Sequence, residues 1–479
     1  MQRNEEMSGL SEQGSNQAWK FEQNGINMVP EAERTGRPRD LFPIWFAANI
    51  GILGIVYGAL IVAFGLNIFQ SILTALVGAF SFMLVGYLSI AGRDGAAPMF
   101  TLSRAIFGIR GNFFPTLMSW INLLGWEAVT ITTGTMSMMA LLSSLGLAQS
   151  GTSAVMSMLL FAALVVLFGL LGQATLIKLQ SFLTWVFGGL TLMVIALIIP
   201  QTDWQQLSSI PAGSWWTSFL PAVSIIMAGT GISWAITASD YSRYQRKEAK
   251  GSAIFWNVTL GGAIPLFVIM TAGILLSSAV PDLVSAGNPI EVIGASLPRW
   301  MTIPYLLTAV GGLIAQAVLS LYSAGLNLQN LGLRIKRTIS VVFDACVMIS
   351  VATYVFFIEQ DFMGPFQSFL ILIGVCLASW EAIFMMDYIL IRKKAGYPKE
   401  LLYAKHQQPE TKQYNGAALS CWLLGIMVGL LFTNSPFFNG PLAVGIFQDS
   451  SLGVLLSFFV SGLSYTIVAL VSKKTSTEA

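Results

Sequence analysis

Long apolar stretches, separated by short polar ones, recur along almost the whole sequence. A helix needs about 20 mostly apolar residues to cross a bilayer, and about twelve such stretches are present between residues 41 and 472. Helices are the expected form because each satisfies its own backbone hydrogen bonds in lipid. We predict spans at roughly 41–65, 68–91, 113–145, 153–173, 177–200, 214–238, 252–280, 302–331, 338–358, 365–391, 416–433 and 452–472.

The composition agrees with an all-α integral membrane protein. Of the 479 residues, 55% are hydrophobic and 10% are charged, whereas soluble domains carry about 25% charged residues. The net charge of +2 gives no reason to expect a nucleic-acid partner. The single histidine, His406, lacks partners for a metal site, so no metal and no other cofactor is expected. Cys346, Cys376 and Cys421 lie in apolar runs and are interpreted as small buried side chains.

The basic residues of the connecting segments predict the orientation. Lys and Arg cluster in the N-terminal segment, after every second predicted span and at the C-terminus, whereas the opposite loops hold only Arg299. Both termini are therefore expected to be cytoplasmic, in a cell membrane. Residues 1–40 are expected to form a polar, disordered tail without a cleavable leader, and residues 473–479 a second tail. The loop 92–112 is expected to contain a short cytoplasmic helix.

Glycines interrupt two of the predicted spans at matching places. Gly51 and Gly54 lie in the middle of the first span, and Gly229 and Gly231 in the middle of the sixth. Glycine weakens a helix, although in membranes it also allows close packing. Because each interrupted span opens a block of five, the pattern favours two inverted repeats with a central binding site. The repeats would be residues 41–200 and 214–391, followed by two extra helices in 416–472.

Glu127 places a carboxylate in the middle of the third predicted span. A charge there costs roughly 2.5–3.5 kcal/mol on insertion scales. It is tolerable beside a protein-lined or wet cavity, or when the group holds a proton. Three interpretations stay open: proton coupling or recognition of a cationic substrate group, a structural pair in the bundle, and a wet vestibule without a role. Asp344 and Glu381 also lie inside spans, and Asp344 is close enough to Arg337 to pair with it.

Six short motifs follow one another in order across residues 41–391. They are Trp45–Asn49, Leu102–Gly108, Gly125–Trp126, Ser239–Tyr244, Leu321–Leu326 and Met386–Tyr388. In their order and spacing the chain resembles the nucleobase–cation symporter family, in particular its purine–cytosine permease branch. The resemblance implies two inverted five-helix repeats plus two helices, alternating access, and uptake of nucleobases or related N-heterocycles.

The resemblance also implies a binding site between spans 1, 3, 6 and 8. Trp126 matches the aromatic residue that stacks on the heterocycle, and Ser233 matches a residue that contacts substrate. Thr130 lies one turn after Trp126, where relatives carry an amide. Each of the three also has a purely structural reading, as a packing tryptophan or as hydroxyls bonded to the preceding backbone turn. Gly51 and Gly231 would offer backbone groups to the substrate.

The sequence departs from the family pattern in span 8 and in span 1. The family's substrate-binding Asn appears as Ala317, with Gln316 as the nearest amide. Ala315 and Gln316 stand where sodium-coupled members place hydroxyls, and Leu53 stands where the fungal branch uses Ser. These changes leave open whether a proton or sodium is the coupling ion, and whether the substrate is a nucleobase.

We therefore predict a secondary active transporter, not an enzyme, whose partners are a small-molecule substrate, a coupling cation and the lipid bilayer. It is expected to be monomeric. One alternative is a transporter for another small metabolite: an amine, a vitamin-like pyridine or pyrimidine, or a ureide. A remote alternative is a membrane sensor or a membrane enzyme, for which the spans lack a cluster of histidine and acidic ligands.

Overall fold

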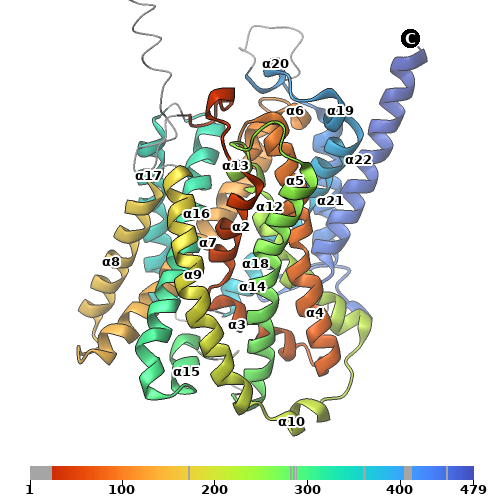
Figure 1. The fold of residues 1–479 in the computed structure, drawn as a ribbon. Helices are drawn as coiled ribbons and strands as arrows, with labels where there is room; N and C mark the ends of the chain where they lie inside the picture. The colour runs from red at the N-terminus through yellow and green to blue at the C-terminus, as the bar shows by residue number, and fades with distance from the viewer. Residues whose placement is uncertain are drawn as a thin grey trace, which may run out of the picture.

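The computed structural model describes residues 24–170, 173–280, 283, 286, 288–333, 335–359, 363–403, 413–448 and 451–478. These residues form a bundle of long helices, with α8 at one edge and α22 at the opposite edge (Figure 1). His406 and the first 23 residues of the predicted N-terminal tail lie outside the described part of the chain.

The first half of the chain follows the predicted spans closely, with most ends within a few residues of those predicted. Its helices are α2 (Leu41–Asn49), α3 (Leu53–Ala63), α4 (Ile68–Phe80), α5 (Phe82–Gly95), α6 (Met99–Phe107), α7 (Phe113–Ser144), α8 (Gly151–Gly169), α9 (Gln173–Ile198), α10 (Trp204–Ser209), α11 (Leu220–Gly229), α12 (Gly231–Ala235) and α13 (Ala238–Ser242). The predicted short helix in loop 92–112 is α6. Its first backbone N–H, at Met99, donates to the Asp240 carboxylate over 2.9 Å.

The second half follows the prediction equally well. Its main helices are α14 (Gly251–Ala279), α15 (Pro289–Ala295), α16 (Thr302–Asn330), α17 (Arg337–Tyr354), α18 (Met363–Asp387), α19 (Lys393–Ala395), α20 (Lys399–Tyr403), α21 (Gly416–Leu431) and α22 (Gly453–Glu478). A two-residue hairpin, β1 (Asn434–Ser435) with β2 (Phe438–Asn439), follows α21. The helix α22 continues through most of the segment predicted as a C-terminal tail.

Nine helices of the described chain are long and apolar enough to cross a membrane, or ten if the bent pair α2 and α3 counts as one span. The remaining two predicted spans correspond to α7 and α21. The helix α7 has 32 residues but carries many polar ones, and α21 has 16 residues. A count of twelve spans therefore stays a prediction.

Both predicted helix interruptions are present as breaks. The chain bends by 63° between the α2 segment and α3, at residues 50–52. In the sixth span α11 ends at Gly229, and Thr230 leaves helical geometry with φ −122° and ψ −100°. Gly231 follows directly, and a Cβ there would lie 2.3 Å from Ser81 Oγ and 2.4 Å from the Ser81 carbonyl oxygen. Only glycine therefore fits the close approach of α12 to the junction of α4 and α5.

The expectation of disorder for residues 1–40 is wrong for residues 24–40. This segment lies across one end of the bundle, where its backbone exchanges hydrogen bonds with helix ends. The Val29 N–H donates to the Ala96 carbonyl over 2.8 Å, and the Gly36 N–H donates to the Tyr244 carbonyl over 2.9 Å. Unpaired carbonyls at helix ends offer partners that composition alone does not reveal.

Asp387 and the three cysteines complete the description of the helices. Asp387, at the end of α18, accepts from Arg392 Nε over 3.3 Å and from the Tyr465 hydroxyl over 2.7 Å, so its carboxylate is paired within the bundle. All three cysteines are free thiols, but Cys346 is exposed on α17 and only Cys421 is fully buried. A helix that faces lipid can expose a thiol without contact with water, so an apolar run does not imply burial within the protein.

Candidate functional site

A small cavity of about 20 Å³ lies beside the break between α2 and α3. It has room for about one water molecule, so a ring-sized ligand requires the surrounding side chains to move. Its walls come from both interrupted spans, from α7, α14 and α16. The lining residues are Ala48, Asn49, Gly51, Leu53, Gly54, Tyr57, Trp126, Gly229, Trp234, Leu266 and Gln316.

Three aromatic side chains dominate the cavity wall. Trp126, predicted as the stacking residue, is 6% exposed and contributes from α7. Its ring meets Phe366 and Phe369 edge-on, at centroid distances of 5.9 and 6.0 Å. Tyr57 and Trp234 complete the aromatic wall and were not predicted. Aromatic faces are the surfaces on which flat heterocycles stack.

A hydrogen-bonded network ties α7 to the interrupted sixth span behind this wall. The Trp126 indole N–H donates to Ser233 Oγ, and the Ser233 hydroxyl donates to Asn122 Oδ1 over 3.0 Å. Asn122 Nδ2 is buried and has no partner among the described residues. Asn122 was missed in the sequence, although its spacing of four residues from Trp126 places both on one face of a helix. Ser233 thus holds the Trp126 ring rather than lining the cavity itself.

Gln316 and Gly51 face each other at the cavity. Gln316 is 7% exposed, and its amide makes no hydrogen bond within the described part of the chain. Its Oε1 would lie 4.0 Å from a Cβ at Gly51, so the two are in near contact. Ala317, which aligns with the family's Asn, is fully buried and does not line the cavity. The structure therefore brings the predicted amide, Gln316, to the site.

The structure does not bring Thr130 and Gly231 to the cavity. The Thr130 hydroxyl donates to the Glu127 carbonyl over 2.9 Å, which is a bond to the preceding turn of its own helix. Gly231 faces Ser81, whose hydroxyl accepts from the Gly231 N–H over 3.0 Å. On the sixth span Gly229 lines the cavity instead, and its carbonyl accepts from the Tyr57 hydroxyl over 3.2 Å.

Glu127 points away from the cavity and toward α17. It is 0% exposed, and its carboxyl group contacts that of Asp344. The Trp120 indole N–H donates to Asp344 Oδ1 over 2.6 Å. The side chain of Arg337, which was considered as a partner of Asp344, lies outside the described residues. Of the predicted readings of Glu127, the wet vestibule does not fit this fully buried contact.

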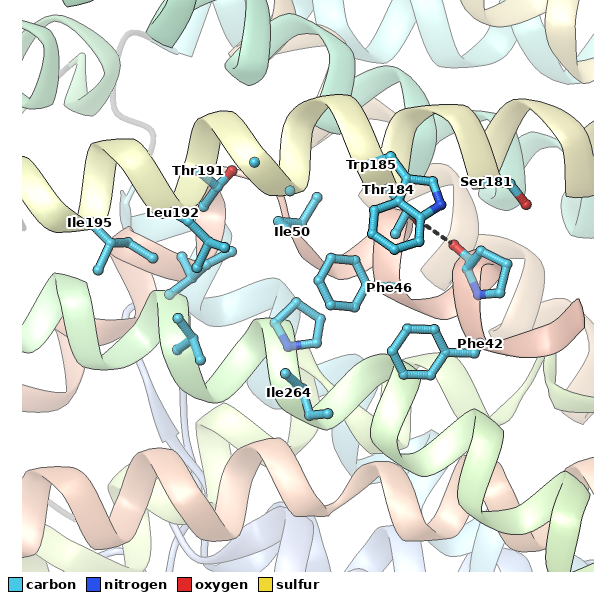
Figure 2. A pocket seen from close by; sticks show the side chains of 16 residues that line it. Phe42, Phe46, Ile50, Ser181, Thr184, Trp185, Thr191, Leu192, Ile195 and Ile264 are labelled. Atoms are coloured by element: carbon cyan, nitrogen blue, oxygen red, sulfur yellow. Dashed lines mark hydrogen bonds between the residues drawn. The ribbon is translucent and has the colours of Figure 1, made fainter. Parts of the chain in front are cut away.

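A larger hollow, of about 560 Å³, lies on the outer side of α2, between α9 and α14. Figure 2 shows Phe42 and Phe46 of α2 facing Thr184 and Trp185 of α9 across it. Trp185 is 83% exposed, so this hollow opens on the surface that meets lipid in a membrane. Its polar atoms are few, and the Thr184 hydroxyl already donates to the Pro43 carbonyl over 3.1 Å. The hollow therefore has few hydrogen-bond partners for the polar edge of a heterocycle.

Comparisons with known proteins agree with this architecture. Residues 28–462 match the model of the permease family for cytosine/purines, uracil, thiamine and allantoin, and the chain belongs to this family. The chain is 26% identical over 472 residues to "Putative purine-cytosine permease YxlA" of Bacillus subtilis (strain 168), covering 94% of this chain and 96% of that one. It is 26% identical over 267 residues to purine-cytosine permease FCY2 of Saccharomyces cerevisiae, covering 53% and 47%.

The fold is that of solved secondary transporters. The structure of Mhp1, a nucleobase-cation-symport-1 family transporter with bromovinylhydantoin bound, superposes with a TM-score of 0.73 at 18% identity, over 93% of this chain and 96% of that one. A Na⁺-coupled sialic acid symporter superposes with a TM-score of 0.61 at 13% identity, over 95% and 92%. The protein is therefore a multi-pass membrane permease, and members of its family are transporters rather than enzymes.

Proposed function

We propose that this permease imports a nucleobase or a related small N-heterocycle by alternating access, coupled to a cation gradient. The observation that carries the proposal is the cavity at the broken first span, where Trp126, Tyr57 and Trp234 supply ring faces beside the amide of Gln316. A flat heterocycle needs an aromatic surface for its ring and a few fixed polar groups for its edge. The names of the relatives YxlA and FCY2 point to the same class of substrate.

In this proposal Trp126 stacks on the ring, and Gln316 donates to or accepts from its edge. Ser233 and Asn122 hold the Trp126 indole in position. The unwound backbone near Gly51 offers further polar groups, as broken helices do in transporters of this architecture. Because the cavity now holds only about 20 Å³, substrate entry requires Trp126, Gln316 or the α2–α3 break to move.

A proton is the favoured coupling cation. A sodium site needs several oxygen ligands. Of the two positions that match the family's hydroxyls, Ala315 has no side-chain oxygen and its carbonyl already accepts from Gln180 Nε2 over 2.9 Å, which leaves the amide oxygen of Gln316 as the one side-chain oxygen there. Glu127, by contrast, is a carboxyl group buried beside a second one. A carboxyl group can gain and lose a proton within the span, so Glu127 is assigned to coupling rather than to substrate contact.

A second substrate class is favoured by the apolar part of the cavity. Leu53 and Leu266 both line it, and Leu53 stands where the fungal branch has Ser. A pyridine, or a pyrimidine with fewer polar substituents than cytosine, would leave fewer buried polar groups unpaired than cytosine would. This candidate keeps the same fold, the same cavity and the same coupling.

The orientation and architecture complete the proposal. We infer that both termini are cytoplasmic in a cell membrane, that the protein acts as a monomer, and that residues 41–200 and 214–391 are inverted repeats. Arg104 of α6 donates to the Leu402 carbonyl of α20, and Arg392 donates to the Ala105 carbonyl of α6. Basic side chains therefore gather at the end of the bundle where Figure 1 shows α6 and α20, which supports the inferred cytoplasmic side.

The test is uptake into proteoliposomes that contain the purified permease. Labelled cytosine, adenine, hypoxanthine, pyridoxine and a small amine are offered under an imposed proton gradient, an imposed sodium gradient, and neither. We expect accumulation of at least one N-heterocycle under the proton gradient. Accumulation of the amine alone would overturn the ring-stacking assignment, and accumulation under sodium alone would overturn the choice of cation.

A further inference from the structure

We propose that Glu127 and Asp344 form one proton-binding site, a carboxyl–carboxylate pair between α7 and α17 that takes up and releases the coupling proton. This inference rests on the proton-coupled uptake proposed above, and it names the residues that bind the coupling proton. The pair is separate from the substrate cavity, because neither residue is among those that line it.

The contact itself requires a proton. The two carboxyl groups are in contact, and both residues are 0% exposed. With both groups ionised, neither Glu127 oxygen nor Asp344 Oδ2 has a donor among the described residues. Two carboxylates offer only acceptors, so they repel each other unless one of them is protonated. One shared proton turns the repulsive contact into a hydrogen bond.

Trp120 distinguishes the two members of the pair. Its indole N–H donates to Asp344 Oδ1 over 2.6 Å, and an N–H donor stabilises the ionised form of a carboxylate. Glu127 has no such donor in the described structure. Asp344 is therefore the acceptor of the pair and Glu127 the group that carries the proton. Trp120 and Glu127 are seven residues apart, which places both on the face of α7 that meets α17.

Among the described residues, Asp344 is the one charged group that interacts electrostatically with the Glu127 carboxyl group. Apart from Glu127 itself, α7 and α8 carry no titratable residue. The other titratable residues on elements packed against α7 or α17 are Tyr305 and Tyr322 of α16, Arg337, Cys346 and Tyr354 of α17, Cys376, Glu381 and Asp387 of α18, Glu291 of α15, and Glu359.

The position of the pair suggests how the proton is linked to the substrate. Glu127 directly follows Trp126 in α7. A movement of α7 that changes the surroundings of the Trp126 side chain therefore also changes the surroundings of the Glu127 side chain. A proton from water forms an O–H bond on Glu127 and closes the α7–α17 contact. Loss of that proton to water leaves two buried negative charges side by side, which favours a conformation that separates or hydrates them. The substrate site and the proton site thereby share one rigid element.

Isosteric amides provide the test. In Glu127→Gln or Asp344→Asn the new NH₂ group donates to the remaining carboxylate, so the pair holds together without a shared proton. Infrared difference spectra of the purified permease between alkaline and acidic pH are expected to contain a band from a buried protonated carboxyl group. We expect this band to be lost in both variants and retained in Glu381→Gln, a matched control in which the buried carboxyl of α18 is changed. Persistence of the band in either pair variant, or its loss in the control alone, would overturn the pair.

Transport measurements distinguish a failure of this inference from a failure of the proposed function. In both pair variants, accumulation driven by a proton gradient is expected to fall to the level without a gradient, while exchange of labelled for unlabelled substrate stays measurable. Gradient-driven accumulation that survives in both variants would overturn the pair as the coupling site. If the wild-type permease transports no N-heterocycle at all, the proposed function fails, and the infrared titration still decides whether the pair binds a proton.

Discussion

At the scale of single residues, the ring face and the indole N–H of Trp126 have different roles. Its ring face lines the central cavity, and its indole N–H is bound to Ser233. The adjacent residue, Glu127, points to a different neighbour because consecutive helical side chains are about 100° apart. Two neighbouring residues therefore serve the proposed substrate and proton sites without overlapping.

Replacement of Trp126 tests the stacking role. Stacking of a base on an aromatic side chain is worth about 1–3 kcal/mol by alanine substitution, so Trp126→Ala is expected to raise the KM of uptake by roughly tenfold or more. Trp126→Phe keeps a ring face and loses only the bond to Ser233, so its KM is expected to change less.

The matched control for this experiment is Trp185→Ala. Trp185 is 83% exposed and lines the outer hollow rather than the central cavity, so its removal is expected to leave the KM unchanged. The stacking role is refuted if Trp126→Ala, correctly folded, transports with the wild-type KM.

At the scale of elements, close helix packing depends on glycines whose neighbours are backbone atoms. The helices α3 and α14 approach at Gly58, where a Cβ would lie 2.1 Å from the Met270 carbonyl oxygen and 2.7 Å from Gly273 Cα. Backbone atoms in two packed helices cannot rotate away as a side chain can. The helix contact beside the broken first span is therefore sensitive to one added methyl group.

Gly58→Ala is expected to destabilise the permease. Overpacking of a close-packed core costs typically about 1–3 kcal/mol, and the measurement is the temperature of unfolding in detergent, followed by tryptophan fluorescence. The control is Gly189→Ala on α9, where an added Cβ meets nothing within 4 Å. This control is expected to be neutral or slightly stabilising. Equal unfolding temperatures for the two variants would contradict the packing argument.

At the scale of the whole molecule, the N-terminal segment 24–40 connects helices that are far apart in sequence. Arg34 Nε donates to the Gln245 carbonyl over 3.1 Å, and Arg34 Nη2 donates to the Arg93 carbonyl over 2.5 Å. Burial lowers the pKa of the Arg34 guanidinium, and the nearby Glu31 carboxylate acts in the opposite direction. Arg34 thus fastens the segment to α5 and to the chain after α13.

Arg34→Ala is expected to loosen this segment. Hydrogen bonds from charged donors contribute about 1.5–3 kcal/mol each, so the amides of Val29 and Gly36 are expected to exchange with deuterium roughly tenfold faster or more. Mass spectrometry after exchange is the measurement. Arg37→Ala serves as the control, because the Arg37 side chain is 53% exposed and, among the described residues, pairs only with Asp40 at 3.6 Å. Unchanged exchange in Arg34→Ala would show that the segment is held by its backbone alone.

Much of this architecture was predictable because, in a membrane protein, a long apolar segment indicates a membrane-spanning helix. Apolar runs of about 20 residues must be helices in lipid, and most predicted ends agree with the structure within a few residues. Gly51 and Gly231 marked the two breaks, because a glycine in a span weakens the helix. The polar composition of residues 24–40 was misleading, since their partners are carbonyls at the ends of distant helices.

The candidate site was predictable only in part. Trp126 and Gln316 were named from the sequence and both reach the cavity. Tyr57 and Trp234 were not named, because an aromatic residue in an apolar span gives no sign of which neighbour it faces. Asp344 was expected near Arg337, and its contact with Glu127 joins residues 217 positions apart. No local pattern encodes such a contact.

The order of residues along the chain was enough to predict a bundle of membrane helices, the positions of those helices, the two breaks, and the need to explain a carboxyl group at Glu127. Those conclusions follow from hydropathy and from backbone hydrogen bonding, which act along the chain. The tertiary structure decided which side chains meet: it turned Gln316 into the cavity, Thr130 onto its own helix, and Glu127 onto Asp344. Helix rotation and packing set these contacts, and both depend on every neighbouring helix at once.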